Sequence, residues 1–276
     1  MATLAVTGAN GKTGRAVIAA LGGAWDVRAL ARTVEQAGAL EAAGCSVVIG
    51  DLAEPAAIGD LVRGADAVYH ICPNFHPDEP SIGRHVAEAA ADVERFVYHS
   101  VLHPQTSAMP HHSRKLQVEE LLLAARPGRA TFLRPAPYVQ NLAPYVNEAM
   151  ATDELRMPYS VDTTTAMVDL ADVGRAARAV LEGAVDAGSG WDLCGVAAVS
   201  HREIAARLST LTGRSIEAVA VDPDPTVPAE VRSMFTYMDA YGLPGSTGQL
   251  RALVGEPTPL DDSLRQLVDV AAGVPR

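Results

Sequence analysis

The sequence predicts an α/β fold, a doubly wound parallel sheet followed by a smaller C-terminal lobe. From residue 3 to about 135, short apolar runs alternate with longer amphipathic ones, which is typical of consecutive βαβ units. A glycine-rich segment at residues 7–14 separates the first apolar run from the first amphipathic one. We therefore expect a sheet domain at 1–135 and a lobe at 136–276, with some segments of the lobe returning to the sheet.

The elements of the sheet domain are expected in regular alternation. Each strand is a short apolar run, and each helix carries apolar residues at helical spacing. No internal repeat, low-complexity tract or charge block interrupts the order. The strands are expected at Thr3–Thr7, Val27–Ala31, Ser46–Gly50, Ala67–Cys72, Arg95–Ser100 and Ala130–Arg134, and the helices at Lys12–Leu21, Val34–Ala43, Pro55–Val62, Ser81–Ala91 and Ser113–Ala125.

The chain changes character after Pro135, where prolines punctuate the sequence and regular elements become sparser. No shift in composition is sharp enough to mark a flexible linker, so we expect the lobe to pack against the sheet domain. Its helices are expected at Ala171–Glu182, Ser200–Thr212, Pro228–Ala240 and Leu260–Ala271, and its short strands near Thr165–Val168, Gly190–Leu193 and Ile216–Val221.

The composition argues against polyanionic partners. The 276 residues include 22 Lys plus Arg and 33 Asp plus Glu, so the formal charge is −11, whereas nucleic acids and anionic membrane surfaces are bound through clustered cations. Aromatic residues make up 5% of the chain, which leaves little material for base stacking. Of the basic residues only Lys12 and Lys115 are lysines, so the positions of these two are informative.

The cysteines and the N-terminus predict a cytoplasmic protein. Cys45, Cys72 and Cys194 are odd in number and far apart, which argues against a disulfide framework and against a zinc ribbon. The first apolar strand begins after two residues, without a basic leader, and no run of about 18 apolar residues follows. We expect a soluble, unprocessed chain with no membrane partner.

The segment Thr7-Gly8-Ala9-Asn10-Gly11-Lys12-Thr13-Gly14 has the features of a dinucleotide-binding loop. Glycines allow backbone conformations and close approaches that a Cβ would block, and the helix that follows presents N–H groups to a diphosphate. The spacing is G-x-x-G-x-x-G, and its place between a strand and a helix makes the pattern specific. Because a cation in the first helical turn opposes the helix dipole, Lys12 is expected to meet phosphate. The loop residues expected at the cofactor are Gly8, Asn10, Gly11, Lys12, Thr13 and Gly14.

The end of the second strand favours NADP(H) over NAD(H), which remains an alternative. NAD sites place an acidic residue there to hold the ribose 2′-hydroxyl, whereas this chain has Arg32. A guanidinium binds a 2′-phosphate in bidentate fashion and stacks on adenine. The ends of the next two strands complete the expected site, with Asp51 and Leu52 at the adenine edge and Ile71, Cys72 and Pro73 beside the ribose and nicotinamide.

These features resemble the NmrA-like branch of the atypical short-chain dehydrogenase/reductases over nearly the whole chain. The resemblance implies a Rossmann-like fold, NADP(H) binding that includes Pro135, and a substrate cleft between the carboxyl edge of the sheet and a substrate-binding lobe at 136–276. It is carried by T-G-A-N-G-K-T-G at 7–14, R-A-L-A-R at 28–32, F-V-Y-H-S-V at 96–101, K-L-Q-V-E-E at 115–120, L-R-P-A-P-Y-V-Q-N-L at 133–142, V-D-L-A-D-V-G at 168–174, W-D-L-C-G at 191–195 and T-G-R at 212–214.

The resemblance also implies a Ser or Thr after the fifth strand and a Tyr-x-x-x-Lys motif on the next helix. The chain has Ser100 and Lys115, but His111 stands where the tyrosine is expected, with His112 beside it. In the family the lysine holds the nicotinamide ribose and lowers the tyrosine pKa, so Lys115 is expected to keep the ribose-binding role. The usual mechanism of carbonyl reduction therefore does not carry over unchanged.

Three routes around the missing phenol are open. His111 or His112 could act as the general acid, since an imidazole titrates near neutral pH. Tyr138, after the sixth strand, could reach the cleft from another side. Alternatively, a quinone, flavin-like or iminium acceptor takes hydride without a positioned acid, and water completes the reaction. NmrA-like enzymes of quinone and imine reduction are similar in having lost the tyrosine, which favours the third route.

The histidines do not predict a metal site. Seven of the eight lie within residues 70–112, but they form no H-E-x-x-H motif, and His99 and His103 do not share a helix face. We expect some of them to line the cleft, where the ends of the fourth and fifth strands meet, and His201 to lie on the surface. Cys72 is expected to be a small buried apolar residue rather than a nucleophile.

The sequence thus favours an NADP(H)-dependent oxidoreductase that passes hydride to a small quinone, imine or conjugated carbonyl acceptor. The alternatives are a cofactor-sensing regulator without turnover and a nonredox lyase or isomerase on the same fold, and the presence of Ser100 and Lys115 favours catalysis. The expected partner is a small molecule, and the expected oligomeric state is a monomer or homodimer. The loops at Asn74–Pro80, Tyr138–Met150 and Pro223–Met238 are expected to decide the substrate.

Overall fold

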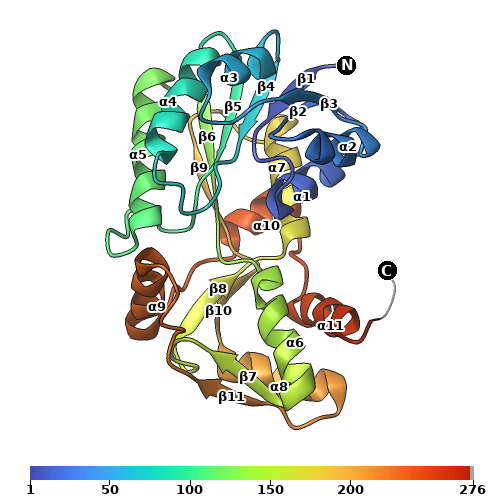
Figure 1. The fold of residues 1–276 in the computed structure, drawn as a ribbon, viewed down its shortest axis with the longest axis vertical. Coiled ribbons are helices and arrows are strands. Elements are labelled where there is room, and N and C mark those ends of the chain that lie inside the picture. Colours follow the sequence, from blue (N-terminus) through green and yellow to red (C-terminus); the bar gives the residue numbers. More distant parts are fainter. Residues whose placement is uncertain (274–276) are drawn as a thin grey trace. The chain divides into compact units, whose positions relative to one another are not determined.

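The computed structural model describes residues 1–273, and their contacts divide the chain into two compact units (Figure 1). The first unit consists of residues 1–107, 111–134 and 173–191. The second consists, among the described residues, of 108–110, 135–172 and 192–273. The sequence after Pro135 therefore contributes one segment to the first unit.

A seven-stranded parallel sheet is the centre of the first unit, in the order β3-β2-β1-β4-β5-β6-β9. The winding reverses at β1, which pairs with both β2 and β4, and this is the switch point of a doubly wound sheet. The order confirms the predicted fold class. The strands are β1 (Thr3–Val6), β2 (Asp26–Ala31), β3 (Ser46–Ile49), β4 (Ala67–His70), β5 (Arg95–His99), β6 (Ala130–Pro135) and β9 (Gly190–Leu193), and the helices are α1 (Lys12–Leu21), α2 (Val34–Ala42), α3 (Pro55–Val62), α4 (Glu79–Ala89), α5 (Pro110–Ala125) and α7 (Leu170–Leu181).

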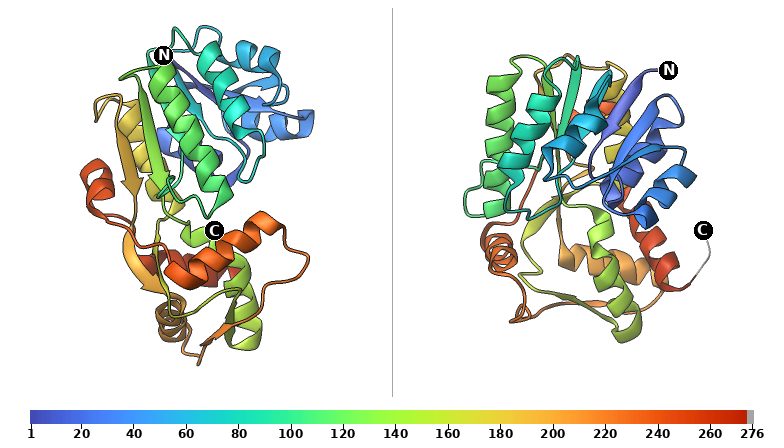
Figure 2. Two further views of the ribbon diagram at one scale, coloured as in Figure 1. Left: turned by 90° about the vertical axis from the view of Figure 1, so that its left-hand side faces the viewer. Right: turned by 45° about the horizontal axis from the view of Figure 1, so that its top comes forward.

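Helices α3, α4 and α5 pack on one face of the sheet and enclose an apolar core (Figure 2). The strands contribute Phe96 and Tyr98 to this core, both fully buried. Helices α4 and α5 approach each other closely at Gly83, where a Cβ would lie 2.8 Å from Cγ1 of Val118. Along β5, the side chains of Phe96 and Tyr98 point to this face of the sheet, and the residues between and beside them point to the opposite face.

Arg126 closes the C-terminal end of α4. The residue is 1% exposed, and its guanidinium donates to the carbonyl oxygens of Ala90, Ala91 and Val93. These carbonyls follow the last helical turn and have no partner within the helix, so a buried donor group satisfies them. The guanidinium carbon also lies 5.3 Å from the centroid of the Phe96 ring.

Two helices of the first unit begin earlier than the sequence predicts. Helix α4 begins at Glu79 rather than Ser81, with a proline in its first turn, where the missing N–H has no cost. Helix α5 begins at Pro110 rather than Ser113 for the same reason. The earlier start of α5 places its two histidines on the first helical turn.

The second unit is built from two small sheets and a set of helices around a separate apolar core. In the first sheet β7 runs parallel to β11, and in the second β8 runs antiparallel to β10. Val146, Leu155, Ile204 and Leu264 of the core are fully buried. The elements are a 3-10 helix η1 (Val139–Leu142), α6 (Ala143–Thr152), β7 (Glu154–Met157), β8 (Thr164–Met167), β10 (Val196–Ser200), α8 (His201–Thr212), β11 (Glu217–Ala220), α9 (Ala229–Tyr241), α10 (Gly248–Val254) and α11 (Leu260–Ala271).

The expectation of sparse structure after Pro135 is wrong. The segment Tyr138–Met150, expected as a loop, contains η1 and most of α6. Its proline lies in the first turn of α6, where proline favours a helix instead of ending it. By contrast, the helix predicted at Pro228–Ala240 is present as α9 (Ala229–Tyr241). Strands β7 and β10 and helix α10 are also missed by sequence periodicity because they are short.

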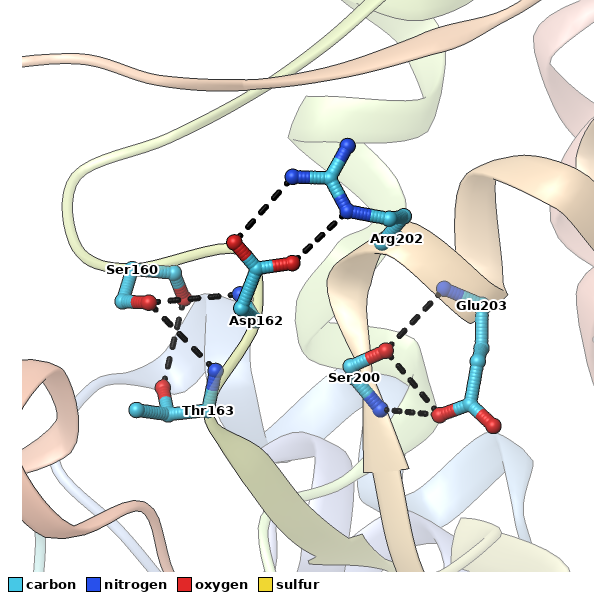
Figure 3. A network of polar contacts seen from close by, with 6 residues as sticks. All are labelled: Ser160, Asp162, Thr163, Ser200, Arg202 and Glu203. Atoms are coloured by element: carbon cyan, nitrogen blue, oxygen red, sulfur yellow. Dashed lines mark hydrogen bonds and ion pairs between the residues drawn. The ribbon is translucent and has the colours of Figure 1, made fainter.

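The expectation that His201 lies on the surface is wrong, since the residue is 1% exposed. It follows Ser200, which caps α8 in a capping box with Glu203 (Figure 3). Its ring packs edge-on against Tyr159, with centroids 5.2 Å apart. The residue of this segment that does face solvent is the next one, Arg202, which forms an exposed bidentate ion pair with Asp162 (Figure 3).

The V-D-L-A-D-V-G segment joins three parts of the second unit through two buried carboxylates. Asp172 accepts hydrogen bonds from the backbone N–H and the hydroxyl of Thr258, both at 2.7 Å. Asp169 accepts from Ser263 Oγ at 2.6 Å and from Gln140 Nε2 at 2.8 Å. The two acids therefore fix the start of α11 and η1 to the segment that leads into α7, which is a structural role.

The three cysteines, Cys45, Cys72 and Cys194, are free and buried. Among residues 1–273, no helix has both the length and the apolar character that are needed to cross a membrane.

A methyl group added at Gly174 should destabilise the first unit. Its Cβ would lie 2.6 Å from the carbonyl oxygen of Ala16 in α1 and 2.9 Å from Cβ of Ala20. We expect Gly174→Ala to lower the free energy of unfolding by about 1–3 kcal/mol. Gly38→Ala is the matched control, because nothing lies within 4 Å of the added atom, and it should stabilise by about 0.4–1 kcal/mol. Urea denaturation measures both, and equal effects would contradict the close packing of α7 on α1.

Candidate functional site

The glycines of the first loop let β1 and α1 approach the end of β4. Gly8 has a φ of 62°, and a Cβ there would lie 2.9 Å from both Cβ and the carbonyl oxygen of Ile71. A Cβ at Gly14 would lie 2.5 Å from the carbonyl oxygen of Gly8. The turn is closed by a hydrogen bond of 3.1 Å from the N–H of Gly11 to that same carbonyl. Larger residues at these positions would push the loop outward.

The hydroxyl of Thr7 fixes the loop to the end of β4. It accepts from the N–H of Ile71 at 2.8 Å, and it lies 3.0 Å from the carbonyl of Ile71 and 2.9 Å from Nδ1 of His70. A hydroxyl has one hydrogen, and a carbonyl can only accept it. Nδ1 of His70 is therefore the donor to Thr7, and Nε2 carries the lone pair. Burial, followed by the charge of Lys115, lowers the pKa of His70 to about 3, so the ring is neutral.

The N-terminus of α1 has the character of an anion site. No side chain caps the helix, and its first turn contains no acidic residue. Both polar atoms of the Asn10 side-chain amide are buried and have no hydrogen-bond partner among residues 1–273. Buried amides are normally satisfied, so this one is available to a ligand. Lys12 and Thr13 lie on the first turn of the same helix, where the sequence places them at the diphosphate.

The end of β2 carries an exposed guanidinium beside a capped helix. Arg32 follows β2, and its side chain makes no ion pair or hydrogen bond within the described chain. Its backbone N–H donates to Oε1 of Gln36 at 3.0 Å, and Thr33 caps α2 by accepting from the Gln36 N–H. In the neighbouring loop, Oδ1 of Asp51 accepts from the N–H of Ala53 at 2.8 Å, while Leu52 is buried. Because these strands are parallel, both loops leave the same edge of the sheet.

A buried ion pair holds Lys115 of α5. Its Nζ lies 2.7 Å from Oε1 of Glu79 in α4, and the two side chains are 6% and 0% exposed. Tyr98 Oη donates to the same carboxylate oxygen at 2.8 Å, and the ammonium lies 5.6 Å from the centroid of the Tyr98 ring. Sequence reasoning missed Glu79 because it placed the residue in a loop. The signal that finds it is chemical, since a buried lysine needs a carboxylate nearby.

His111 and His112 lie one helical turn before Lys115 and are buried. The ring of His111 packs against Phe75, with centroids 4.4 Å apart, and edge-on against the ring of His112. Nδ1 of His112 donates to the carbonyl of His103 at 3.0 Å. Burial lowers the pKa of His111 to about 3 and that of His112 to about 4. Both imidazoles are therefore neutral near pH 7, and neither supplies an imidazolium there.

Two strained residues support these histidines. Phe75 and His103 have φ values of 62° and 53°, which are uncommon for residues with a Cβ. They lie in the loops that follow β4 and β5, and each contacts one histidine of α5. Strain of this kind persists where the surrounding structure fixes it, and it is concentrated at functional sites.

The remaining candidates are divided between the two units, with Ser100, Cys72 and Pro73 in the first and Pro135 and Tyr138 in the second. Ser100, after β5, is 2% exposed, and its Oγ has no partner among residues 1–273. Cys72 is 4% exposed, and burial raises the pKa of its thiol to about 12, as expected for a small apolar residue rather than a nucleophile. Pro73, beside it, is exposed. Pro135 and Tyr138 belong to the second unit, where Tyr138 forms a backbone bridge with Val168.

The site therefore joins loop residues after β1 to β5 with three residues of α5, all in the first unit. No group of three or more metal-ligating side chains gathers anywhere in residues 1–273. The uncapped N-terminus of α1 and the exposed guanidinium of Arg32 are groups of the kind that bind phosphate.

Comparisons with known proteins place the chain among reductases and their relatives. A profile of the NmrA-like family matches residues 1–245. The (4-alkanoyl-5-oxo-2,5-dihydrofuran-3-yl)methyl phosphate reductase of Streptomyces griseus is 32% identical over 221 residues, which are 79% of this chain and 77% of that protein. Quinone oxidoreductase 2 of Escherichia coli is 29% identical over 221 residues, which are 77% of this chain and 76% of that protein.

Solved structures show the same fold over nearly the full length. Triphenylmethane reductase of Citrobacter sp., complexed with NADP(H), has a TM-score of 0.84 at 22% identity and covers 97% of this chain and 100% of its own. Nmra, a negative transcriptional regulator in complex with NAD, has a TM-score of 0.83 at 20% identity and covers 99% of this chain and 98% of its own.

Acid should destabilise the protein through its buried histidines. The pKa is lowered by burial to about 3 for His70, His99 and His111 and to about 4 for His112 and His201. An unfolded chain binds these protons near pH 6.5. The stability is therefore present above about pH 6.5 and is lost as the pH falls toward these lowered values.

We expect the urea midpoint to fall between pH 7.5 and pH 5, and to fall less in His111→Phe. This variant keeps a ring against Phe75 and removes one titrating group, and Nδ1 of His111 has no partner to lose in residues 1–273. The comparison at pH 7.5 is the control for packing. An equal slope in both proteins would contradict a lowered pKa at His111.

Proposed function

This chain belongs to the NmrA-like family, and from that premise we propose that it is an NADPH-dependent reductase of a small quinone, imine or conjugated carbonyl compound. The observation that carries the proposal is the neutral His111 in the place of the tyrosine of standard short-chain dehydrogenase/reductases, one turn before an ordered Lys115. The lysine that binds the cofactor is retained, and the strong proton donor is absent.

The residues of the first unit fit a dinucleotide. Gly8 and Gly14 leave a cradle that a Cβ would fill, and the Asn10 amide is buried without a partner in the described chain. The diphosphate would lie at the N-terminus of α1, and Arg32 would bind the 2′-phosphate that distinguishes NADPH. The ammonium of Lys115 would bind the nicotinamide ribose. When bound, the nicotinamide supplies the hydride.

The neutral histidines favour an acceptor that needs no positioned acid. Hydride addition to a quinone or to a conjugated carbonyl compound gives a delocalised anion, which takes a proton from water. A simple ketone would give a localised alkoxide, whose formation requires a proton donor at that oxygen. The relatives support this choice, since one reduces a quinone and the other is named for a 5-oxo-2,5-dihydrofuran, which has a ring double bond next to a carbonyl.

Replacing Arg32 should remove the preference for NADPH. The wild-type protein is expected to bind NADPH more tightly than NADH, because the guanidinium pairs with the 2′-phosphate. Arg32→Gln should weaken NADPH binding by about tenfold or more, the value of one charged hydrogen bond, and leave NADH binding nearly unchanged. Isothermal titration calorimetry measures both affinities. Arg63→Gln is the control, since it removes an equal charge from an exposed ion pair, and equal losses in both variants would refute a specific contact.

The purified protein should oxidise NADPH in the presence of quinones, conjugated carbonyl compounds or cyclic imines, as followed by the loss of nicotinamide absorbance.

His111→Phe and His112→Asn, made separately, should retain the wild-type pH–rate profile, because neither ring is charged near neutral pH. Loss of one limb of the profile would instead assign the proton to that histidine. Tight NADPH binding without oxidation by any acceptor would favour a cofactor-sensing regulator.

A further inference from the structure

We propose that Glu79 is a positioning residue for the cofactor: its buried carboxylate holds the Lys115 ammonium in one place. The inference rests on the proposed function, because it concerns the lysine that would bind the nicotinamide ribose. It adds a residue from a different helix, 36 positions away in the sequence, to the cofactor site.

The geometry restricts the carboxylate from two sides. Oε1 of Glu79 accepts from Nζ of Lys115 at 2.7 Å and from Oη of Tyr98 at 2.8 Å. Glu79 lies in the first turn of α4, Lys115 in α5 and Tyr98 in β5. One oxygen atom therefore joins two helices and the sheet. A lysine side chain has four flexible methylene groups, and this contact selects one arrangement of them.

The ion pair is not explained by stability. Removing two charges from water costs several kcal/mol for each, and apolar side chains of similar volume serve as well or better in many cores. Oε2 of Glu79 is also buried without a partner in residues 1–273, which adds to the cost. A buried ion pair that adds so little to stability is a candidate for function.

Glu79 supplies the negative charge that faces Lys115, because the other titratable groups that sense the ammonium are uncharged or positive. The groups that sense its charge are His70 and Cys72 at the end of β4, His99 of β5, and His111 and His112 of α5. Burial keeps the imidazoles and the thiol uncharged, as their shifted pKa values show. Arg114 adds a second positive charge that acts on Cys72 and His111. Tyr98 is neutral because burial raises its pKa.

A charged and fixed ammonium has a use at this place. It has three N–H donors, and Glu79 takes one of them, which leaves two for the hydroxyls of a ribose. Without the carboxylate, the flexible methylene groups of the side chain are no longer held in one arrangement. The two remaining donors are then less well placed, so the contact with the ribose should weaken.

The test is calorimetric binding of NADPH and of 2′,5′-ADP, which lacks the nicotinamide ribose, at pH 7.5. Glu79→Gln replaces the charged acceptor of the ammonium by a neutral one, and we expect its NADPH affinity to be about tenfold below that of wild type. Its affinity for 2′,5′-ADP should match that of wild type. Tyr98→Phe keeps the ring and the carboxylate but removes one donor to Oε1, and it should give a smaller loss of the same kind.

Glu119→Gln is the matched control. Glu119 is on the same helix, one turn after Lys115, is similarly buried, and pairs with Arg134 at 2.5 Å and 2.9 Å. Its loss should reduce stability and leave both ligand affinities unchanged. The proposal is overturned if Glu79→Gln or, where that variant does not fold, Tyr98→Phe binds NADPH as wild type does, or loses affinity for 2′,5′-ADP equally. Failure of the wild-type protein to bind NADPH would instead refute the proposed function.

Discussion

The close approach of the first loop to the end of β4 is the constraint on which the cofactor site depends. Gly8 lies against Ile71 with no room for a Cβ, and the Thr7 hydroxyl bonds to both backbone polar groups of that residue. This contact ties the two strands at the switch point of the sheet and sets the direction in which α1 leaves it. It also requires His70 to donate from Nδ1. The Thr7 hydroxyl therefore fixes both the conformation of the loop and the tautomer of the buried imidazole.

Helix α5 carries a second constraint, which is electrostatic. Lys115 and Glu119 lie one turn apart on the helix, and each pairs with a partner on a different element, Glu79 on α4 and Arg134 on β6. Such pairs require defined geometry, because an unpaired charge at this depth is strongly unfavourable. The same low-polarity environment keeps His111 neutral. Burial therefore explains both why Lys115 and Glu119 require paired partners and why His111 is uncharged.

The first half of the fold was predictable because each element repeats a short local pattern. The bounds of Lys12–Leu21 follow from glycines before it and apolar residues within it, and the structure has the same bounds. Helix α6 was not predictable in this way, because a proline such as Pro144 occurs both in loops and in the first turn of a helix. The burial of His201 and the pairing of Glu79 depend on residues far away in the sequence, and no local pattern records such contacts.

The cap that Arg126 forms on α4 has a consequence for the lengths of two helices. Glu79 begins α4, and Ala90 follows the last residue of that helix, eleven positions later. Their partners Lys115 and Arg126 are also eleven residues apart, from the middle of α5 to just past its end. At about 1.5 Å per residue, each span is about 16 Å, so α4 is joined to α5 both at its start and just past its end. Insertion or deletion of one residue within either span would break one of these two contacts, so a change of length is better tolerated in the loops outside them.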